Sequence, residues 1–563
     1  MIGRRQFLAS MAALSTARPS FAGENLLSNG RTKEYALSID EIDVNFTGKL
    51  ARALAVNGQV PGPALRFRDG DDAVIHVTNN LDVMSSIHWH GLLVPPEMDG
   101  VPGVSFKGIS PGETFTYRFP IRQTGTYWYH SHSAYQEQQG VYGSLIIEPR
   151  GAEPAPFDRE HTIVLSDWLD TDPADVHANL KSMSDYYNYA QRTVGDFFDF
   201  VSDEGLSAAA NERLAWGNMR MTPTDLSDVS GYTFLLNGLT TDQPWFGEMK
   251  PGECVRLRFI NAGAMSYFDV RIPGLKMTVV EADGQAVVPV PVDEFRIAVA
   301  ETYDVIVEPQ DDTSHQIIAE AMDRSGFAIG QLGGDQNERM DLPASRSRSL
   351  LSMDDMGGDH GRMDHGQTHS GASESTPKTD HSMMDHAAMG HAMPMAMAAP
   401  VVTRDNEHVP PVYAPEGARV LTYQDLVALI PNDDLREPDE ELTMTLGGNM
   451  ERYIWTLNGD KFSEATPIYL EYGQRVRITY VNETMMNHPM HLHGMFVELE
   501  NGQPPETRPR KHIVNVGPGR RYSVTFTADE AGEWAFHCHL LYHMASGMMS
   551  KMVVSRVNAE LSL

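Results

Sequence analysis

One short pattern occurs three times along the chain, and it restricts the fold more than any other feature of the sequence. Each copy has an Asn-Gly dipeptide and then a glycine that opens a stretch of alternating apolar and polar residues ending at asparagine. The dipeptides begin at Asn57, Asn237 and Asn458, and the stretches run from Gly70 to Asn79, Gly252 to Asn261 and Gly473 to Asn482. Alternation with period two is typical of strands, whereas helical periodicity is scarce in this chain. A spaced repeat indicates homologous units, so we expect an all-β chain with three related β-domains.

The first and third copies share features that the second lacks. In both, a Pro-Gly pair opens a strand 19 residues before a histidine, at Pro111 before His130 and at Pro518 before His537. The second copy carries no histidine cluster. We therefore place the chemistry in domains one and three and expect domain two to be a spacer. The predicted domain boundaries are 34–150, 158–310 and 415–557.

Length and charge narrow the choice of partners. At 563 residues the chain is long enough for about three or four domains. With 44 Lys and Arg against 76 Asp and Glu, it carries a formal charge of −32 at pH 7. A surface of this sign repels phosphates, so neither nucleic acid nor anionic lipid is expected as a partner.

The N-terminus has the features of an export signal. Arg4 and Arg5 precede a short, modestly apolar stretch over 7–14, and Ser20-Phe21-Ala22 gives a small-x-small cleavage pattern. This combination predicts a twin-arginine signal over residues 1–22, with a simple basic N-terminus as the alternative. The twin-arginine machinery exports folded proteins, so we expect a periplasmic protein that acquires its cofactor before export. No later segment is long and apolar enough to predict a membrane span.

A segment between domains two and three differs in composition from the rest. Residues 350–400 are rich in Met, His, Asp, Gly and Ser, as in Met363-Asp364-His365-Gly366, and have almost no aliphatic core formers. Such a segment buries too little apolar surface to offset chain entropy, so we expect it to be disordered without metal. Thioether sulfur suits Cu(I) and imidazole also accepts Cu(II). The segment is therefore predicted to bind labile copper, the alternative being an uninvolved polar linker.

Ten of the 22 histidines fall in four tight clusters, two in each of two homologous domains. The clusters are His88-Trp89-His90, His130-Ser131-His132, His488-Pro489-Met490-His491-Leu492-His493, and His537-Cys538-His539 with His543 following. Buried histidines that only fill a core do not occur in such sets. Alternate residues of a strand point to one face, so each His-x-His pair presents two imidazoles in one direction. Four pairs supply eight imidazoles, enough for three copper ions with open positions for oxygen.

The cysteine between two histidines predicts a separate metal site. In His537-Cys538-His539 the imidazoles face one way and the thiolate the other, so Cys538 can bind a further copper joined to the cluster by a short electron path. His488, Cys538 and His543 would be the strong ligands and Met548 the weak axial one, with Met549 as the alternative. A disulfide is the other interpretation of two cysteines in an exported protein. For Cys254 we expect a small, buried apolar side chain instead.

These residues resemble the multicopper oxidase superfamily over nearly the whole mature chain. The resemblance implies three cupredoxin-like Greek-key β-barrels, a type 1 copper in the third domain and a trinuclear cluster between domains one and three that reduces dioxygen to water. By motif position, His88 and His491 match the type 2 ligands. The type 3 ligands would be His90, His130, His132, His493, His537 and His539. Relatives with three domains are commonly monomers.

A narrower resemblance is to the CopA-type copper-resistance oxidases. It is carried by the twin-arginine signal, the Met-Asp-His repeats, Met221-Thr222-Pro223-Thr224-Asp225 and Gly448-Asn449-Met450-Glu451-Arg452-Tyr453. Asp99 matches a superfamily acid that helps deliver protons to oxygen, although a turn aspartate before Gly100 is the alternative. Many relatives have a second acid directly after the residue matching His543. Here Met544 stands there, which puts that proton route in doubt.

The electron donor is the least determined feature. Cuprous oxidases of the superfamily have a Met that corresponds to Met486, and some have an Asp where Thr484 stands here, next to Glu483. The alternative for Met485 and Met486 is that they fill the core. We favour oxidation of periplasmic Cu(I) in copper tolerance. The alternatives are a laccase-like oxidase of phenols, which would use an exposed type 1 histidine, and a non-enzymatic copper-sequestering protein.

Overall fold

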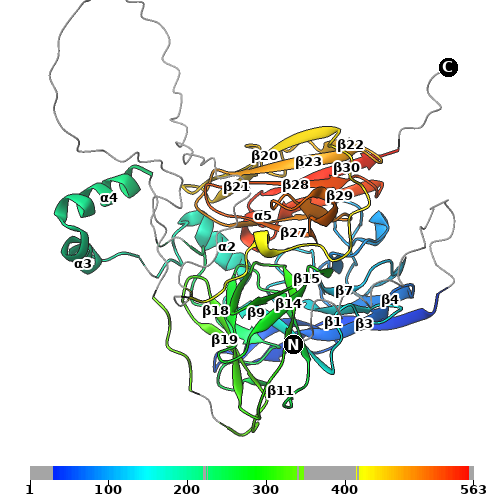
Figure 1. The fold of residues 1–563 in the computed structure, drawn as a ribbon. Coiled ribbons are helices and arrows are strands. Elements are labelled where there is room, and N and C mark those ends of the chain that lie inside the picture. The colour runs from blue at the N-terminus through cyan, green and yellow to red at the C-terminus, as the bar shows by residue number, and fades with distance from the viewer. Residues whose placement is uncertain are drawn as a thin grey trace, which may run out of the picture.

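The computed structural model describes residues 30–189, 191–219, 224, 226–338, 341–347, 414 and 417–556. Their strands form six sheets, arranged as two sheets in each of three domains (Figure 1). The predicted signal over 1–22 and the Met/His-rich segment over 350–400 lie outside the described residues and stay predictions. Within the described ranges, no helix is long and apolar enough to cross a membrane.

The first domain contains two four-stranded sheets, with the orders β2-β1-β4-β6 and β3-β8-β7-β5. Its strands are β1 (Thr32–Val44), β2 (Ala51–Val56), β3 (Gly62–Arg68), β4 (Asp72–Asn79), β5 (His88–His90), β6 (Thr114–Pro120), β7 (Gly125–His130) and β8 (Tyr142–Glu148). Side chains of both sheets, among them Ile75 and Leu145, form one buried core. The short 3-10 helix η1 (Pro96–Met98) follows β5.

The second domain has the sheet orders β10-β9-β12-β17-β14-β15 and β11-β19-β18-β13-β16. Its strands are β9 (Arg159–Trp168), β10 (Thr233–Leu236), β11 (Trp245–Gly247), β12 (Val255–Asn261), β13 (Phe268–Arg271), β14 (Met277–Ala282), β15 (Gln285–Val292), β16 (Glu294–Ile297), β17 (Thr302–Val307), β18 (His315–Ala321) and β19 (Phe327–Leu332). Cys254, for which we expect a buried side chain, lies just before β12. It is half-buried instead, and it packs beside Ala155, Val280 and Ile306. Both cysteines are free, so the disulfide alternative does not apply.

The third domain has the sheet orders β21-β20-β23-β28-β25-β26 and β22-β30-β29-β24-β27. Its strands are β20 (Glu440–Asn449), β21 (Ile454–Leu457), β22 (Ile468–Glu471), β23 (Arg475–Asn482), β24 (His488–Leu492), β25 (Val497–Leu499), β26 (Arg510–Lys511), β27 (Ile513–Val516), β28 (Arg521–Thr527), β29 (Gly532–Cys538) and β30 (Met549–Ser555). Two 3-10 helices are η2 (Tyr423–Asp425) and η3 (Pro505–Thr507). One continuous apolar core runs through domains two and three.

The recurring asparagines have the same structural role in all three domains. Asn79, Asn261 and Asn482 end β4, β12 and β23, and each side-chain amide donates to at least two carbonyl oxygens of the chain that follows. Each side-chain oxygen accepts from the backbone N–H two residues later. The repeat in the sequence therefore encodes one loop anchor used three times.

The Asn-Gly pairs are also equivalent. Asn57, Asn237 and Asn458 have φ angles of 55°, 52° and 54°. Two consecutive residues with positive φ form the tight turn that suits twisted antiparallel strands, and Asn-Gly is the pair that tolerates it best. The prediction of an all-β chain built from three cupredoxin-like domains is confirmed.

The helices were not anticipated from the sequence. α2 (Pro173–Ser182), α3 (Val194–Glu204) and α4 (Leu206–Met219) are inserted between β9 and β10, and α5 (Leu541–Ala545) follows β29. Thr193 and Asp196 form a reciprocal capping box that starts α3. α3 and α4 pack on each other and extend away from the sheets (Figure 1).

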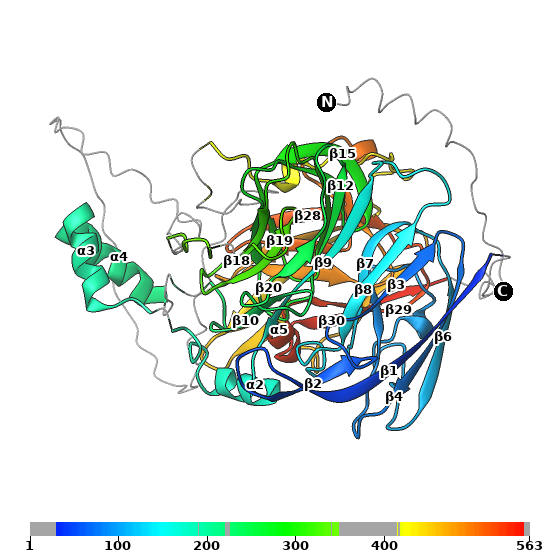
Figure 2. The same cartoon turned by 90° about the horizontal axis from the view of Figure 1, so that it is seen from below.

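A turn of domain two is buried between the other two domains. Asp283, with φ of 50°, accepts hydrogen bonds from the backbone N–H groups of His512 and Ile513 in domain three. A Cβ on the next residue, Gly284, would lie 2.3 Å from the ring of Tyr127 in β7, so glycine is required there. β7 lies beside β12 of domain two (Figure 2). Domain two thus holds domains one and three in a fixed relation.

Candidate metal centres

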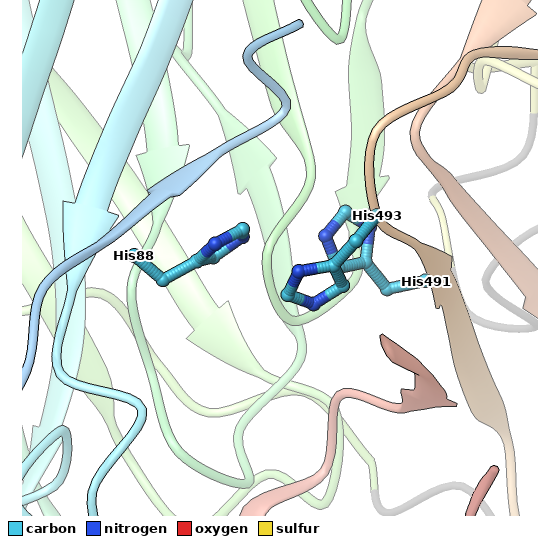
Figure 3. A group of neighbouring side chains, drawn as sticks. All are labelled: His88, His491 and His493. Atoms are coloured by element: carbon cyan, nitrogen blue, oxygen red, sulfur yellow. The ribbon is translucent and has the colours of Figure 1, made fainter. Parts of the chain in front are cut away.

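Four strands bring the predicted ligands together, two from domain one and two from domain three. β5 pairs with β7 so that His88 lies opposite His130, and β24 pairs with β29 so that His491 lies opposite His537. Figure 3 shows His88 facing His491 and His493, which come from domain three. The two domains therefore present their histidines to one another, as the repeat of His-x-His pairs predicts.

Eight imidazoles form three groups, and in each group one possible ligand atom per residue lies within 4.8 Å of the others. The groups are His90 with His130 and His539, His132 with His493 and His537, and His88 with His491 and His493. Each group contains residues of both domains. The Nε2 atom of His537 lies 3.0 Å from that of His493 and 3.3 Å from that of His132. These nitrogens are close enough to share one cation.

Burial favours the neutral form of imidazole, which is the form that binds metal. Apart from the half-buried His132, all histidines of the three groups are at most 3% exposed. Burial lowers the pKa of His90 and of His539 well below the usual value, and neighbouring imidazoles lower it further. The pKa of His537 falls to about 4, again mainly through burial. At neutral pH His90, His537 and His539 therefore each have a nitrogen lone pair available for a cation.

The residues present fit metal ions. The Nε2 atoms of His88, His130, His491 and His539 are buried without a hydrogen-bond partner. Buried polar atoms are almost always paired, so four such nitrogens in one place indicate a missing partner. Imidazole nitrogens in this number are ligands for copper, zinc or iron rather than for magnesium or calcium.

The other ring nitrogens of these histidines are hydrogen-bonded to groups that orient the rings. His491 donates from Nδ1 to the carbonyl oxygen of His512 at 2.7 Å, and His88 donates from Nδ1 to that of Asp99 at 2.8 Å. His493 Nδ1 lies 2.8 Å from the Asp99 carboxylate. A histidine that donates from Nδ1 presents Nε2 to a metal. Asp99 is fully buried and sits at the turn before Gly100, so it combines the turn and the site contact predicted as alternatives.

A second, separate group surrounds the cysteine. Cys538 Sγ lies 3.6 Å from His488 Nδ1 and 3.7 Å from His543 Nδ1, and the two Nδ1 atoms are 3.2 Å apart. All three residues are fully buried. Burial raises the pKa of the Cys538 thiol, so a thiolate there requires a cation beside it. Two imidazoles and one thiolate are the strong ligand set of electron-transfer copper sites.

Met548, the predicted weak ligand, lies next to this group. Met548 is fully buried; its backbone N–H donates to the carbonyl oxygen of His543, and its carbonyl accepts from the N–H of Cys538. Met548 also belongs to the same apolar core as Cys538. Met549 lies in a different apolar cluster, with Val101 and Ala535. The surroundings therefore favour Met548 over Met549.

Two groups that the sequence did not assign hold the outer nitrogens of this site. His543 Nε2 lies 2.7 Å from a carboxylate oxygen of Asp228, which also accepts from the Tyr453 hydroxyl at 2.6 Å. Burial raises the pKa of Asp228 to about 7. His488 Nε2 lies 2.7 Å from the Thr484 hydroxyl. Asp228 comes from domain two, in a loop with no repeat or ligand spacing to reveal it.

Comparison with known proteins decides the family. Three multicopper oxidase domain families match the chain, over residues 38–152, 159–329 and 436–558. The copper resistance protein A homologue of Pseudomonas syringae pv. tomato is 50% identical over 548 residues, which is 92% of each chain. The chain belongs to the multicopper oxidase family. Copper resistance protein A of Escherichia coli is 47% identical over 562 residues, again 92% of each chain.

Among solved structures, this multicopper oxidase resembles Fet3p, a multicopper oxidase that functions in iron import. The TM-score is 0.67 at 21% identity, over 93% of this chain and 91% of that one. At this identity the likeness shows the fold alone. The family as a whole implies copper as the cofactor, in agreement with the donor set described above.

Several predictions about this multicopper oxidase can be refined. Met544 packs against an apolar cluster of Val101, Ala535 and Met549, so the position that carries an acid in many relatives is apolar here. Met485 and Met486 are 2% and 4% exposed and belong to the core. His488 and His543 are both 0% exposed, contrary to the exposed histidine assumed for direct oxidation of phenols.

One more histidine, His512, which was not assigned from the sequence, forms a further possible metal-binding group with His90 and His491. The ring centroid of His512 is 4.7 Å from that of His90, and both ring nitrogens are buried without a hydrogen-bond partner, although Nδ1 lies 3.7 Å from a carboxylate oxygen of Asp283. Burial lowers its pKa to about 4. It stands alone in the sequence, so no His-x-His spacing signals it.

Proposed function

We propose that this multicopper oxidase takes single electrons from Cu(I) at a mononuclear type 1 copper and reduces dioxygen to water at a centre of three further coppers, as part of copper resistance. The observation that carries this proposal is the sequence His537-Cys538-His539. Cys538 belongs to the mononuclear group, while the histidines on either side belong to two groups of the other centre. Electrons therefore have a covalent path of one residue between the two centres.

The proposed ligand sets follow the motif positions of the family, and their members lie in the groups of neighbouring side chains described above. His488, Cys538, His543 and the axial Met548 would hold the type 1 copper. His88 and His491 would hold the type 2 copper. His90, His130, His132, His493, His537 and His539 would hold the type 3 pair. The four bound copper ions supply one-electron redox chemistry. The charge balance is four Cu(I), four protons and one dioxygen giving four Cu(II) and two water molecules.

The protein groups around the centres have distinct tasks. Asp99, which contacts one histidine of each domain, is proposed to move protons to the reacting oxygen and to hold His493 in place. Cys538 conducts electrons to its neighbours. Thr484 and Asp228 fix the rings of His488 and His543, which keeps the geometry of the mononuclear site constant during electron transfer.

Two observations favour Cu(I) over a phenol as the electron donor. Similar proteins are named for copper resistance. In addition, both type 1 histidines are buried and their outer nitrogens already have partners, Thr484 and Asp228. No imidazole edge is thus open to a phenol ring. The Met/His-rich segment over 350–400 is proposed to bind labile copper and supply it as substrate.

The setting of this reaction follows from the N-terminus. We propose a monomer in the periplasm, exported in the folded state by the twin-arginine machinery. Oxidation of periplasmic Cu(I) to the less toxic Cu(II) would then protect the cell.

The test compares donors in the presence and absence of the Met/His-rich segment. Oxygen uptake by the copper-loaded protein is measured with a cuprous complex and with a simple phenol, each with and without residues 350–400. The proposal predicts that Cu(I) is the better donor and that the deletion slows only that reaction. A faster phenol reaction, unchanged or increased by the deletion, would make the protein a laccase with a copper-binding appendage.

The third possibility, a copper-sequestering protein without enzymatic activity, is tested separately. It predicts copper binding but no catalytic oxygen uptake in the wild-type protein. The buried set of twelve proposed ligands argues against it, because sequestration alone does not require Cys538 to join two centres.

A further inference from the structure

Two buried carboxyl groups lie next to histidines of the proposed trinuclear centre. Asp99 contacts His88 of domain one through Oδ1, at 3.2 Å, and His493 of domain three through Oδ2, at 2.8 Å. The second is Glu137, in the loop between β7 and β8, which neither the sequence motifs nor the family resemblance assigned.

Glu137 repeats the arrangement of Asp99 with a different pair of histidines. Its Oε2 lies 2.8 Å from Nδ1 of His130 in domain one, and its Oε1 lies 3.9 Å from Nδ1 of His539 in domain three. The side chain of Glu137 is 3% exposed. Oε1 of Glu137 and Nδ1 of His539 are both buried without a hydrogen-bond partner. His130 and His539 belong to the same three-histidine group.

His130 and its counterpart in domain three, His537, share one contact of Nδ1 but differ in a second. His130 Nδ1 lies 3.0 Å from the carbonyl oxygen of the next residue, Ser131, and His537 Nδ1 lies 3.0 Å from that of Cys538. This local contact is thus common to both domains. Glu137 adds a second contact to His130, at 2.8 Å, and its other oxygen lies 3.9 Å from His539 Nδ1 of domain three.

The loop that carries Glu137 is fixed from both domains. Gln136 accepts hydrogen bonds from the hydroxyl groups of Ser85 and Ser131, and Gln138 accepts from the Tyr542 hydroxyl of α5 at 2.6 Å. Gln138 thus joins the same two domains as Glu137 without touching a proposed copper ligand. A carboxylate placed by such a loop has little freedom to move.

We propose that Glu137 is a positioning residue of the trinuclear centre, holding His130 and His539 with Nδ1–H turned toward its two oxygens and Nε2 toward a shared copper. The inference rests on the proposed function. A carboxyl group has two oxygens, so each can face one of the two imidazoles, whereas a carboxamide has one oxygen only. Glu137 also supplies a buried carboxyl group in a site where Met544 stands in place of the acid of many relatives.

The test is copper binding by Glu137→Leu and Glu137→Gln in the full-length protein, with Gln138→Leu as the matched control. Copper content, affinity against a chelator, the blue thiolate–copper absorption and the near-ultraviolet absorption of the type 3 pair are measured together. Loss of a carboxylate that orients a histidine ligand lowers metal affinity by roughly 10–100-fold. We expect that loss at the trinuclear sites of Glu137→Leu, a smaller loss in Glu137→Gln, and an intact blue absorption in both. Gln138→Leu should retain both absorptions.

The outcomes distinguish a failure of the proposed function from a failure of the role of Glu137. A wild-type protein that binds no more than one copper would contradict the proposed function itself. A wild type with four coppers, together with a Glu137→Leu variant of unchanged trinuclear affinity, would overturn only the role of Glu137. If Glu137→Leu does not fold, the nearly isosteric Glu137→Gln decides, and wild-type affinity in that variant would overturn the proposal.

Discussion

Domains two and three use the same pair of strands for opposite purposes. In domain three, β24 and β29 carry the proposed copper ligands; in domain two, the equivalent strands β13 and β18 carry none. The hydrogen bonds of the repeated asparagines show which residues of the two domains correspond. In domain three, Asn482 donates to the carbonyl oxygen of Val516, which pairs with His488. In domain two, Asn261 donates to the carbonyl oxygen of Ile297, which pairs with Phe268.

This register places Phe268 at the position of His488. Cys538 pairs with Met490, two residues after His488, and Ala319 pairs with Val270, two residues after Phe268. Ala319 therefore replaces the cysteine. The same register assigns Arg271 to the position of His491 and Glu320 to that of His539. The Arg271 guanidinium donates to the Glu320 carboxylate at 2.7 Å.

The two domains thus satisfy similar buried positions in different ways. In domain two, ion pairs within the domain balance the buried charges. In addition to Arg271, Arg346 contacts Glu320 and Arg324 contacts the neighbouring Asp269. In domain three, buried imidazoles have ring nitrogens without a hydrogen-bond partner, which an added cation would satisfy. The fold is common to both, and the side chains at a few strand positions decide whether it binds metal.

The largest expected effect comes from changing the two equivalent positions, Cys538 and Ala319, to serine. Cys538→Ser removes the thiolate, so the blue absorption should vanish and oxygen uptake should fall to the background. Ala319→Ser should leave copper content and uptake unchanged and lower the free energy of unfolding by roughly 1–3 kcal/mol, because a hydroxyl is buried. Oxygen uptake by Cys538→Ser at the wild-type rate would contradict the proposed electron path.

The next effect separates stability from copper binding. Glu320→Leu leaves buried arginines without their partner, so the free energy of unfolding should fall by roughly 3–5 kcal/mol while the ligand set remains complete. His539→Leu should do the reverse: copper content at the trinuclear centre falls, but the copper-free protein loses less than about 1.5 kcal/mol, because the side chain is of similar volume. Chemical unfolding of the copper-free variants and copper analysis check both expectations. Equal destabilisation by the two changes would contradict the comparison.

A third prediction concerns acid. In the copper-free protein the folded-state pKa of the buried histidines is lowered, to about 4 for His537. The unfolded chain therefore binds more protons, and stability is lost as pH falls from about 6.5 toward 4. In domain two the pKa of Asp269 and of Glu320 is lowered by their arginine partners despite burial, so their contribution is lost only below about pH 4. Hydrogen exchange of the copper-free protein at pH 5 should show lower protection in β24 and β29 than in β13 and β18.

The smallest effect concerns the supports of the mononuclear site. Asp228→Asn keeps the size of the side chain but weakens the acceptor for His543, so type 1 copper affinity should fall by roughly 10–100-fold. Thr484→Val, which removes one neutral hydrogen bond to His488, should have an effect of roughly 1 kcal/mol, or about fivefold. Titration of the blue absorption against a chelator measures both. An Asp228→Asn variant with unchanged type 1 copper affinity would contradict the role proposed for domain two at this site.

Much of the site could be predicted from the sequence, because its ligands lie in strands and repeat with period two. His88, His130, His491 and His537 follow directly from that spacing. Asp228, Glu137 and His512 could not be predicted in this way, since each reaches the site from a loop and is placed there by contacts between domains. Local periodicity carries no information on such contacts.

The same distinction applies to the fold. The strands that end at Asn79, Asn261 and Asn482 follow from alternation and turn residues. The helices α3 and α4 form an insertion outside the repeat, and the ion pair of Arg271 with Glu320 depends on a strand register that alternation alone does not set. The predicted domain boundaries and the properties of residues 350–400 stay predictions.

The most direct test of the account is the ratio of Cu(I) oxidised to dioxygen consumed by the copper-loaded protein, with Cys538→Ser as the control for oxidation in solution. The account predicts four Cu(I) per dioxygen, no hydrogen peroxide, and a rate that disappears in the variant. Two Cu(I) per dioxygen with accumulation of peroxide, or a rate equal to that of the variant, would contradict it.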